Sequence, residues 1–184
     1  MGTMTVPSAK ADVFETGARE AIDALWSQQF QTELAAFMTA HGSDDDIAGA
    51  WTEHDPAALA THLRASIAGT ELSTFGGVGG LYDKLRYHTI AMDGGGSDTP
   101  VEYDRWSLGD RASPSIANTI AHEVAHHIGL HHPHMGGRPE DKSWPTALCE
   151  PPYLIGSLVE KIAAGPTWRW SSSGDCRWLA PPAH

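Results

Sequence analysis

The chain contains 184 residues, 41% of them hydrophobic and 19% charged, and carries a formal net charge of −11. This composition is typical of a globular protein, and the length suits one domain with a sizeable core, with or without a small appendage. The acidic balance argues against a nucleic-acid surface, which needs clustered Lys and Arg, and no apolar run approaches the ~20 residues that span a bilayer.

The N-terminal residues 1–12 are predicted to form a flexible leader. They contain no apolar core of the kind that a secretory signal has. Since no membrane span is found either, the sequence leaves three alternatives: a cytoplasmic protein, a mature form, or a protein exported by a non-classical route.

Two helices are predicted in the first third of the chain. Apolar residues at three- and four-residue steps favour a helix over about 13–40, which Gly42 ends. Asp55 is a suitable N-cap for a shorter helix, with Pro56 in the first turn and an end near Gly69. The side chains expected in the core are Ala18, Ile22, Leu25, Trp26, Phe30, Leu34, Phe37 and Met38 from the first helix and Leu59, Leu63 and Ile67 from the second.

Two strands are predicted in the middle of the chain. Residues 81–92 and 101–108 contain β-branched and aromatic residues, and the glycine-rich stretch 93–100 between them is typical of a turn. The two strands would form a small antiparallel sheet.

A further helix is predicted over about 114–128, with Ser113 as its cap and Pro114 in its first turn. One row of side chains should pack inward and the neighbouring row should line a cleft. The inward row is Ile116, Ile120, Val124 and Ile128, and the cleft row is Asn118, His122 and His126.

The cleft row contains the motif His122-Glu123-Val124-Ala125-His126. Residues four apart lie one above the other on a helix, so His122 and His126 can direct their imidazoles at one metal ion. Glu123 is adjacent to the first ligand and can reach the place of the reacting water instead. The motif therefore predicts a hydrolytic zinc site with Glu123 as general base.

Gly129 and His132 extend the motif to H-E-x-x-H-x-x-G-x-x-H. Glycine can adopt the left-handed conformation that ends a helix and reverses the chain. Such a turn would bring His132 to the ion that His122 and His126 already hold. Because catalytic zinc usually has three protein ligands, we predict that these three histidines are the metal ligands.

The extended motif resembles that of the metzincin clan of zinc peptidases, and Gly129-Leu130 with His132-Pro133 is most similar to the serralysin branch. The resemblance covers about fifteen residues and implies zinc, peptide-bond hydrolysis and Glu123 as base. It also implies a methionine turn beneath the zinc, for which Met135 is the one methionine after the motif, and the serralysin calcium-binding repeats are missing. By the same resemblance, residues 85–92 would be a substrate-aligning edge strand; an ordinary sheet strand is the alternative.

Other ligand choices stay open at this point. Three further histidines are expected to face solvent or to hydrogen-bond with the ligands: His127, His131 and His134. Of these, His131 is the one that could replace His132. A rival scheme takes the third ligand from a glutamate further along the chain, either Glu150 or Glu160.

The C-terminal part is loop-rich up to Pro151-Pro152, which should start a helix that ends at Gly165. Cys149 and Cys176 could form a disulfide only in an oxidising compartment, and the sequence leaves their state open. The tryptophans after this helix are expected to pack over a small core. The apolar face of the helix would be Leu154, Ile155, Leu158, Val159 and Ile162.

Together these elements predict an α+β, zincin-like fold that is helix-rich, with a small, mostly antiparallel sheet packed on the active-site helix. The expected organisation is the leader 1–12, a zincin-like part 13–132 and a small C-terminal subdomain 133–184.

The predicted function is a monomeric zinc endopeptidase that acts on peptides or proteins and has no nucleic-acid partner. Negative charge developing at the scissile carbonyl needs a donor, for which Tyr153, Tyr87 and His134 are candidates. Two alternatives are a zinc amide hydrolase with a non-protein substrate and a non-catalytic module that only binds metal.

Overall fold

Five α-helices account for most of the residues that the computed structural model of this chain describes. The described residues are 11–42, 50–70, 72–75, 91–93, 101–104, 111–132, 149–171 and 175–180. The helices are α1 (Ala11–Trp26), α2 (Gln28–His41), α3 (Pro56–Gly69), α5 (Ser113–His127) and α7 (Pro151–Ala164), followed by the short 3-10 helices η3 (Gly165–Thr167) and η4 (Arg177–Leu179). The predicted leader lies almost entirely outside the described residues.

The first predicted helix is in fact two helices, because Ser27 separates α1 from α2. The Ser27 hydroxyl accepts a hydrogen bond from the N–H of Phe30 at 3.0 Å and so caps α2. The apolar pattern continues through this break, which is why it suggested a single helix over 13–40. The end at Gly42 is confirmed.

The helix predicted from Asp55 is confirmed as α3. Oδ1 of Asp55 accepts from the N–H of Ala57 at 3.0 Å, and Pro56 occupies the first turn. The predicted inward side chains Leu59, Leu63 and Ile67 are all buried.

The strands within the described ranges form one small sheet with the order β1-β3-β2. They are β1 (Leu72–Phe75), β2 (Ala91–Asp93) and β3 (Val101–Asp104). β3 pairs antiparallel with β2 and parallel with β1, so the sheet is mixed where a mostly antiparallel sheet was predicted. Local residue patterns do not reveal a parallel pair, which depends on the path of the crossover connection. Of the two predicted strands, only 91–92 and 101–104 are described as strand.

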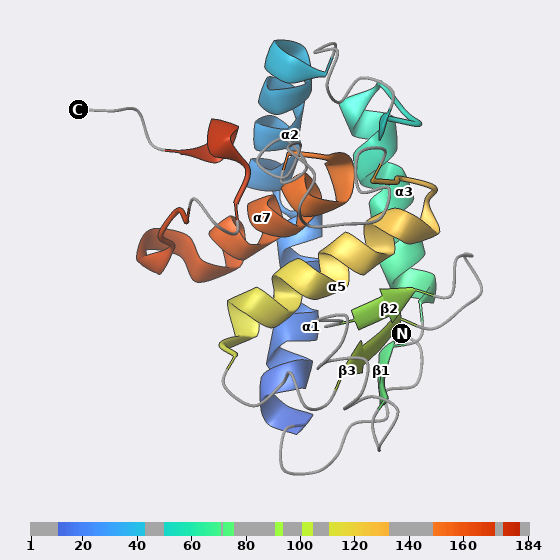
Figure 1. The fold of residues 1–184 in the computed structure, drawn as a ribbon, viewed down its shortest axis with the longest axis vertical. Coiled ribbons are helices and arrows are strands. Elements are labelled where there is room, and N and C mark those ends of the chain that lie inside the picture. Colours follow the sequence, from blue (N-terminus) through green and yellow to red (C-terminus); the bar gives the residue numbers. More distant parts are fainter. Residues whose placement is uncertain are drawn as a thin grey trace, which may run out of the picture.

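Helix α5 crosses the middle of the molecule and makes contact with α1, α3, α7 and the sheet (Figure 1). The helix-rich part of the predicted fold class is therefore confirmed. On the inward row of α5, Ile116, Ile120 and Val124 are fully buried, and Ile128 is partly buried. The prediction of Ser113 as the cap of α5 is wrong: the N-cap is Ala112, and Ser113 is the first helical residue. The Ser113 hydroxyl instead donates to Oε1 of Glu20 on α1 at 2.9 Å.

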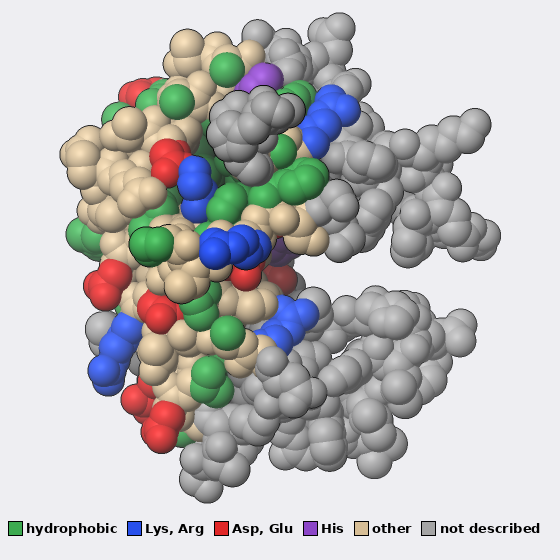
Figure 2. Space-filling view, turned by 90° about the vertical axis from the view of Figure 1, so that its left-hand side faces the viewer, with side chains coloured by type: hydrophobic (Ala, Val, Ile, Leu, Met, Phe, Trp, Pro, Cys, Tyr) green, Lys and Arg blue, Asp and Glu red, His purple; other side chains and the backbone are tan. Residues whose placement is uncertain are grey.

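The predicted last helix is confirmed as α7, which runs from Pro151 to Ala164 with Gly165 as its C-cap, and its predicted apolar face joins the same core as α1 and α5. None of the described helices is long and apolar enough to cross a membrane. On the face shown in Figure 2, basic and acidic side chains are interspersed.

Gly156 allows α7 to lie close to α5, and we predict that Gly156→Ala destabilises the protein. A Cβ at this position would contact the side-chain oxygen of Asn118 on α5 and lie 2.9 Å from its main-chain oxygen. Overpacking of this kind costs about 1–3 kcal/mol. For a chain of this length each kcal/mol lowers Tm by about 2–4 °C.

Thermal unfolding measures this effect, and Gly69→Ala is the matched control. Gly69 is also a helical glycine, but a Cβ there meets no atom within 4 Å. Equal Tm values for the two variants would contradict close packing of α5 and α7 at Gly156.

Candidate metal centre

Helix α5 ends in a Schellman turn built around Gly129. The N–H of Leu130 donates to the carbonyl of Ala125 at 3.1 Å, and the N–H of Gly129 donates to the carbonyl of His126 at 2.9 Å. Gly129 has a φ of +85°, which L-residues rarely adopt. The side chain of Leu130 is fully buried and anchors the turn to the core. The chain reversal predicted at Gly129 is confirmed.

This reversal brings His132 to the two helical histidines. One ligand nitrogen from each of His122, His126 and His132 can be chosen so that all three lie within 4.8 Å of one another. Nε2 of His122 and Nε2 of His132 are 3.2 Å apart. Two nitrogens bound to one tetrahedral zinc at ~2.0–2.1 Å lie roughly 3.3–3.4 Å apart, so this pair has a suitable spacing. The three predicted residues form a group that could hold a metal ion.

Hydrogen bonds on the far side of two of the rings orient them. Nδ1 of His126 donates to the carbonyl of Leu130 at 2.8 Å. Nδ1 of His132 donates to Oε2 of Glu150 at 2.9 Å. In the neutral form of each ring, which metal binding requires, the remaining Nε2 carries a lone pair. Partners of this kind are typical of metal-binding histidines.

The pKa of His122 is lowered well below its ordinary value of 6.5. The largest cause is burial of the ring, and the neighbouring His132 and His126 add electrostatic repulsion of a second charge. A histidine must be neutral to bind a metal ion. The surroundings of His122 therefore favour the form that can act as a ligand.

Because of this lowered pKa, the metal-free protein is expected to lose stability as the pH falls below about 6.5. At a pH between the pKa of His122 in the folded chain and its pKa in the unfolded chain, the ring binds a proton only in the unfolded chain. Lowering the pH in this range therefore favours unfolding. One proton contributes at most about 1.4 kcal/mol per pH unit. The free energy of unfolding in the presence of chelator, measured between about pH 5 and 7.5, tests this.

The variant His122→Gln should show a smaller pH dependence of the free energy of unfolding. His131→Gln is the control, because the His131 ring is exposed. If both variants keep the slope of the unaltered chain, His122 does not cause the pH dependence.

Among the described residues, Tyr153 packs against two of the three histidines, and Glu123, which follows His122 in α5, is close enough to Tyr153 to influence its pKa. Glu123 is 9% exposed on α5. The ring centroid of Tyr153 on α7 lies 4.6 Å from that of His122 and 4.7 Å from that of His132. Burial raises the pKa of Tyr153, and the negative charges of Glu150 and Glu123 raise it further. Tyr153 thus remains a protonated phenol. The other oxyanion candidates, Tyr87 and His134, lie outside the described residues.

His127 and His131, which the sequence did not assign as ligands, lie in different surroundings. His127 was expected to face solvent or to support the ligands, but it is 7% exposed and its Nδ1 lies 3.1 Å from Oγ1 of Thr70. It follows Val124 by three residues and so belongs to the inward side of α5. His131 is exposed and does not replace His132.

The rival glutamates also have assigned contacts. Oε2 of Glu160 accepts from Nδ2 of Asn118 at 2.6 Å, and Glu160 is not in the histidine group. Glu150 is hydrogen-bonded to Nδ1 of His132, the ring nitrogen on the side away from the other two histidines. No local pattern in the sequence indicates this contact, so it was not predicted. Met135 lies outside the described residues, so the two alternatives for it, a shortened methionine turn or a site without that support, are not tested.

The cysteine pair, whose state the sequence left open, forms a disulfide between Cys149 and Cys176. Both residues are fully buried. The bridge spans 27 residues and joins the start of α7 to the segment before η4.

Comparisons of the chain with protein-family models, with curated proteins and with solved structures give no match. The likeness to metzincins therefore rests on the motif and on the convergence of its three histidines.

Proposed function

We propose that this chain is a zinc-dependent peptidase of the metzincin type with a zincin-like fold. The observation that carries the proposal is the convergence of His122, His126 and His132, whose ligand nitrogens lie within 4.8 Å of one another. His126 and His132 would hold the ion through Nε2, since Nδ1 of each is hydrogen-bonded elsewhere. A zinc ion held there would supply Lewis-acid chemistry, which activates water and polarises the scissile carbonyl.

Glu123 is the proposed general base. It adjoins His122 in α5 and is 9% exposed, so it is largely removed from bulk solvent. A carboxylate beside the site can take a proton from the attacking water and pass it to the departing amine.

Tyr153 is the proposed donor to the developing oxyanion. Its ring contacts two of the three histidines, and its raised pKa keeps the hydroxyl proton in place at neutral pH. A protonated phenol can donate a hydrogen bond to oxygen as negative charge develops there.

β2 is the proposed element that aligns an extended substrate. It is an edge strand of the described sheet, and it makes contact with α5. An extended peptide can add to such an edge through main-chain hydrogen bonds. Residues 85–90 of the predicted substrate-aligning strand lie outside the described residues.

Elemental analysis of the purified chain combined with an assay of protein digestion tests the proposed function. We expect one zinc ion per chain and hydrolysis of an unfolded protein substrate. Chelator should stop the hydrolysis, and added zinc should restore it. Hydrolysis that chelator does not affect, or a purified chain that binds no zinc, would contradict the proposal.

The same preparation distinguishes the other two functions. Turnover restricted to small formyl, acetyl or cell-wall amides would assign the chain to the zinc amide hydrolases. Several bound ions per chain without any turnover would indicate metal storage.

A further inference from the structure

Glu150 is the residue at the N-cap of α7, and its carboxylate is fully buried against the candidate metal centre. Oε2 accepts a hydrogen bond from Nδ1 of His132 at 2.9 Å. His132 is the ligand that lies beyond the end of α5, so the helix does not hold it in place as it does the other two. It follows the turn at Gly129, and its ring is hydrogen-bonded to this carboxylate.

The residues after Glu150 offer its side chain only one of the two usual capping partners, because the second helical residue, Pro152, has no N–H while the third, Tyr153, has one. An N-cap side chain usually accepts from the N–H of the second or third helical residue. Pro151 and Pro152 occupy the first two positions of α7 and have no N–H. Glu150 makes no side-chain capping bond, and its carboxylate reaches His132 instead.

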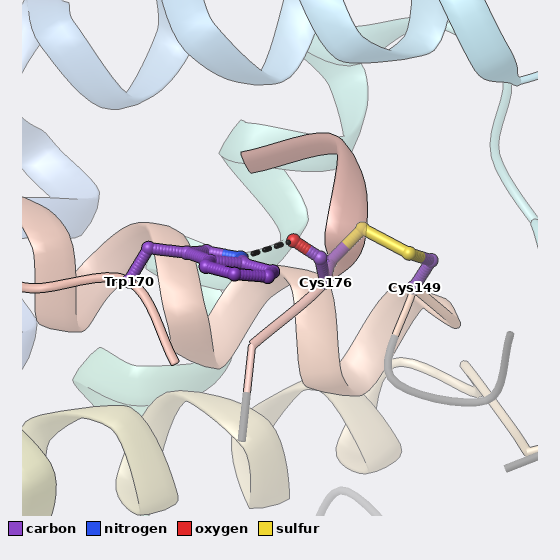
Figure 3. Close-up of a disulfide and its surroundings, with 3 residues drawn as sticks. All are labelled: Cys149, Trp170 and Cys176. Carbon is purple, nitrogen blue, oxygen red and sulfur yellow. Dashed lines mark hydrogen bonds between the residues drawn. A yellow bond between two sulfur atoms is a disulfide. The ribbon is translucent and has the colours of Figure 1, made fainter. Parts of the chain in front are cut away.

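The disulfide holds the backbone immediately before Glu150. Cys149 is bonded to Cys176, and both are fully buried. The indole N–H of Trp170 donates to the carbonyl of Cys176 at 3.1 Å, which ties the far side of the bridge to the segment after α7 (Figure 3). The chain entering α7 is thus fixed at the residue next to the carboxylate.

From these contacts we propose that Glu150 is a positioning residue for His132 and that the Cys149–Cys176 disulfide holds Glu150 in place. This inference rests on the zinc site of the proposed function. The carboxylate keeps the proton of His132 on Nδ1 and the lone pair of Nε2 directed at the metal position. The disulfide is then part of the metal centre and not only a brace for the fold.

The affinity for Zn²⁺ and the absorption spectrum of the Co²⁺-loaded chain test Glu150. Removing an outer hydrogen-bond partner of a ligand typically weakens metal binding by about 10–100-fold. We expect this loss of affinity for Glu150→Ala. The loss should be smaller for Glu150→Gln, because its amide oxygen still accepts from Nδ1 of His132. The Co²⁺ spectrum should be altered in both variants. If Glu150→Ala does not fold, the Zn²⁺ affinity and the Co²⁺ spectrum of Glu150→Gln are compared with those of the unaltered chain.

Glu160→Ala is the matched control. Glu160 is a second, partly buried carboxylate on α7 that bonds to α5, but its partner is Asn118 and not a histidine. Its removal should leave the affinity for Zn²⁺ and the Co²⁺ spectrum unchanged. Equal affinities for the unaltered chain, Glu150→Ala and Glu150→Gln, or an equal loss in Glu160→Ala, would overturn the inference.

Replacing both cysteines by Ser tests the role of the disulfide. The chain for this comparison is produced in an oxidising compartment, where disulfides persist. We expect the double replacement to weaken Zn²⁺ binding when Glu150 is present. In a chain that already carries Glu150→Ala, it should cause no further loss of Zn²⁺ affinity. Equal losses in both backgrounds would show that the disulfide does not act through Glu150. If the unaltered chain itself binds no Zn²⁺, the proposed function fails first.

Discussion

Glu123→Gln is expected to leave zinc bound and to lower kcat/KM by about 10²–10⁴-fold, the usual contribution of a general base. The amide has nearly the shape of the carboxylate but cannot accept the proton of the attacking water. The three histidines are unchanged by this substitution, so the zinc content of the variant should equal that of the unaltered chain. Elemental analysis and steady-state kinetics on one preparation measure both quantities.

The control for this experiment is Glu160→Gln. Glu160 is also partly buried near α5, and its pKa is raised, mainly by burial. It bonds to Asn118 and lies outside the histidine group, so its replacement should leave turnover within a few-fold of the unaltered value. Full activity of Glu123→Gln in a preparation free of other peptidases would reject Glu123 as the base.

His132→Ala is expected to abolish tight zinc binding, whereas His131→Ala should leave it unchanged. The two residues are neighbours in the chain, but only His132 lies in the group with His122 and His126, while the ring of His131 is exposed. Loss of a ligand should weaken binding by more than the roughly 10–100-fold that removal of an outer partner costs.

Thermal unfolding with and without zinc provides the measurement. An ion present at 100 times its Kd stabilises the folded chain by about 2.7 kcal/mol, which raises Tm. We expect this increase in the unaltered chain and in His131→Ala but not in His132→Ala. If zinc still raises Tm in His132→Ala but no longer does so in His131→Ala, then His131 and not His132 is the third ligand.

The sequence predicted the helices well because their signals are local. Asp55 and Pro56 mark the start of α3, and Pro151 and Gly165 mark the two ends of α7. The break at Ser27 was missed because apolar residues continue at helical spacing on both sides of it. The sheet was predicted less well, because strand pairing joins residues that are distant in the chain.

The convergence of His122, His126 and His132 could be predicted from residue order alone, because the four-residue step from His122 to His126 and the glycine at 129 are local features of one helix and its terminal turn. The residues that contact these three rings from other elements could be found only from the folded structure. Glu150 reaches His132 and Tyr153 contacts two of the rings through the packing of α7 against α5. Cys149 bonds to Cys176, which lies in the segment before η4. Such contacts follow from how whole helices pack, which no short stretch of residues encodes.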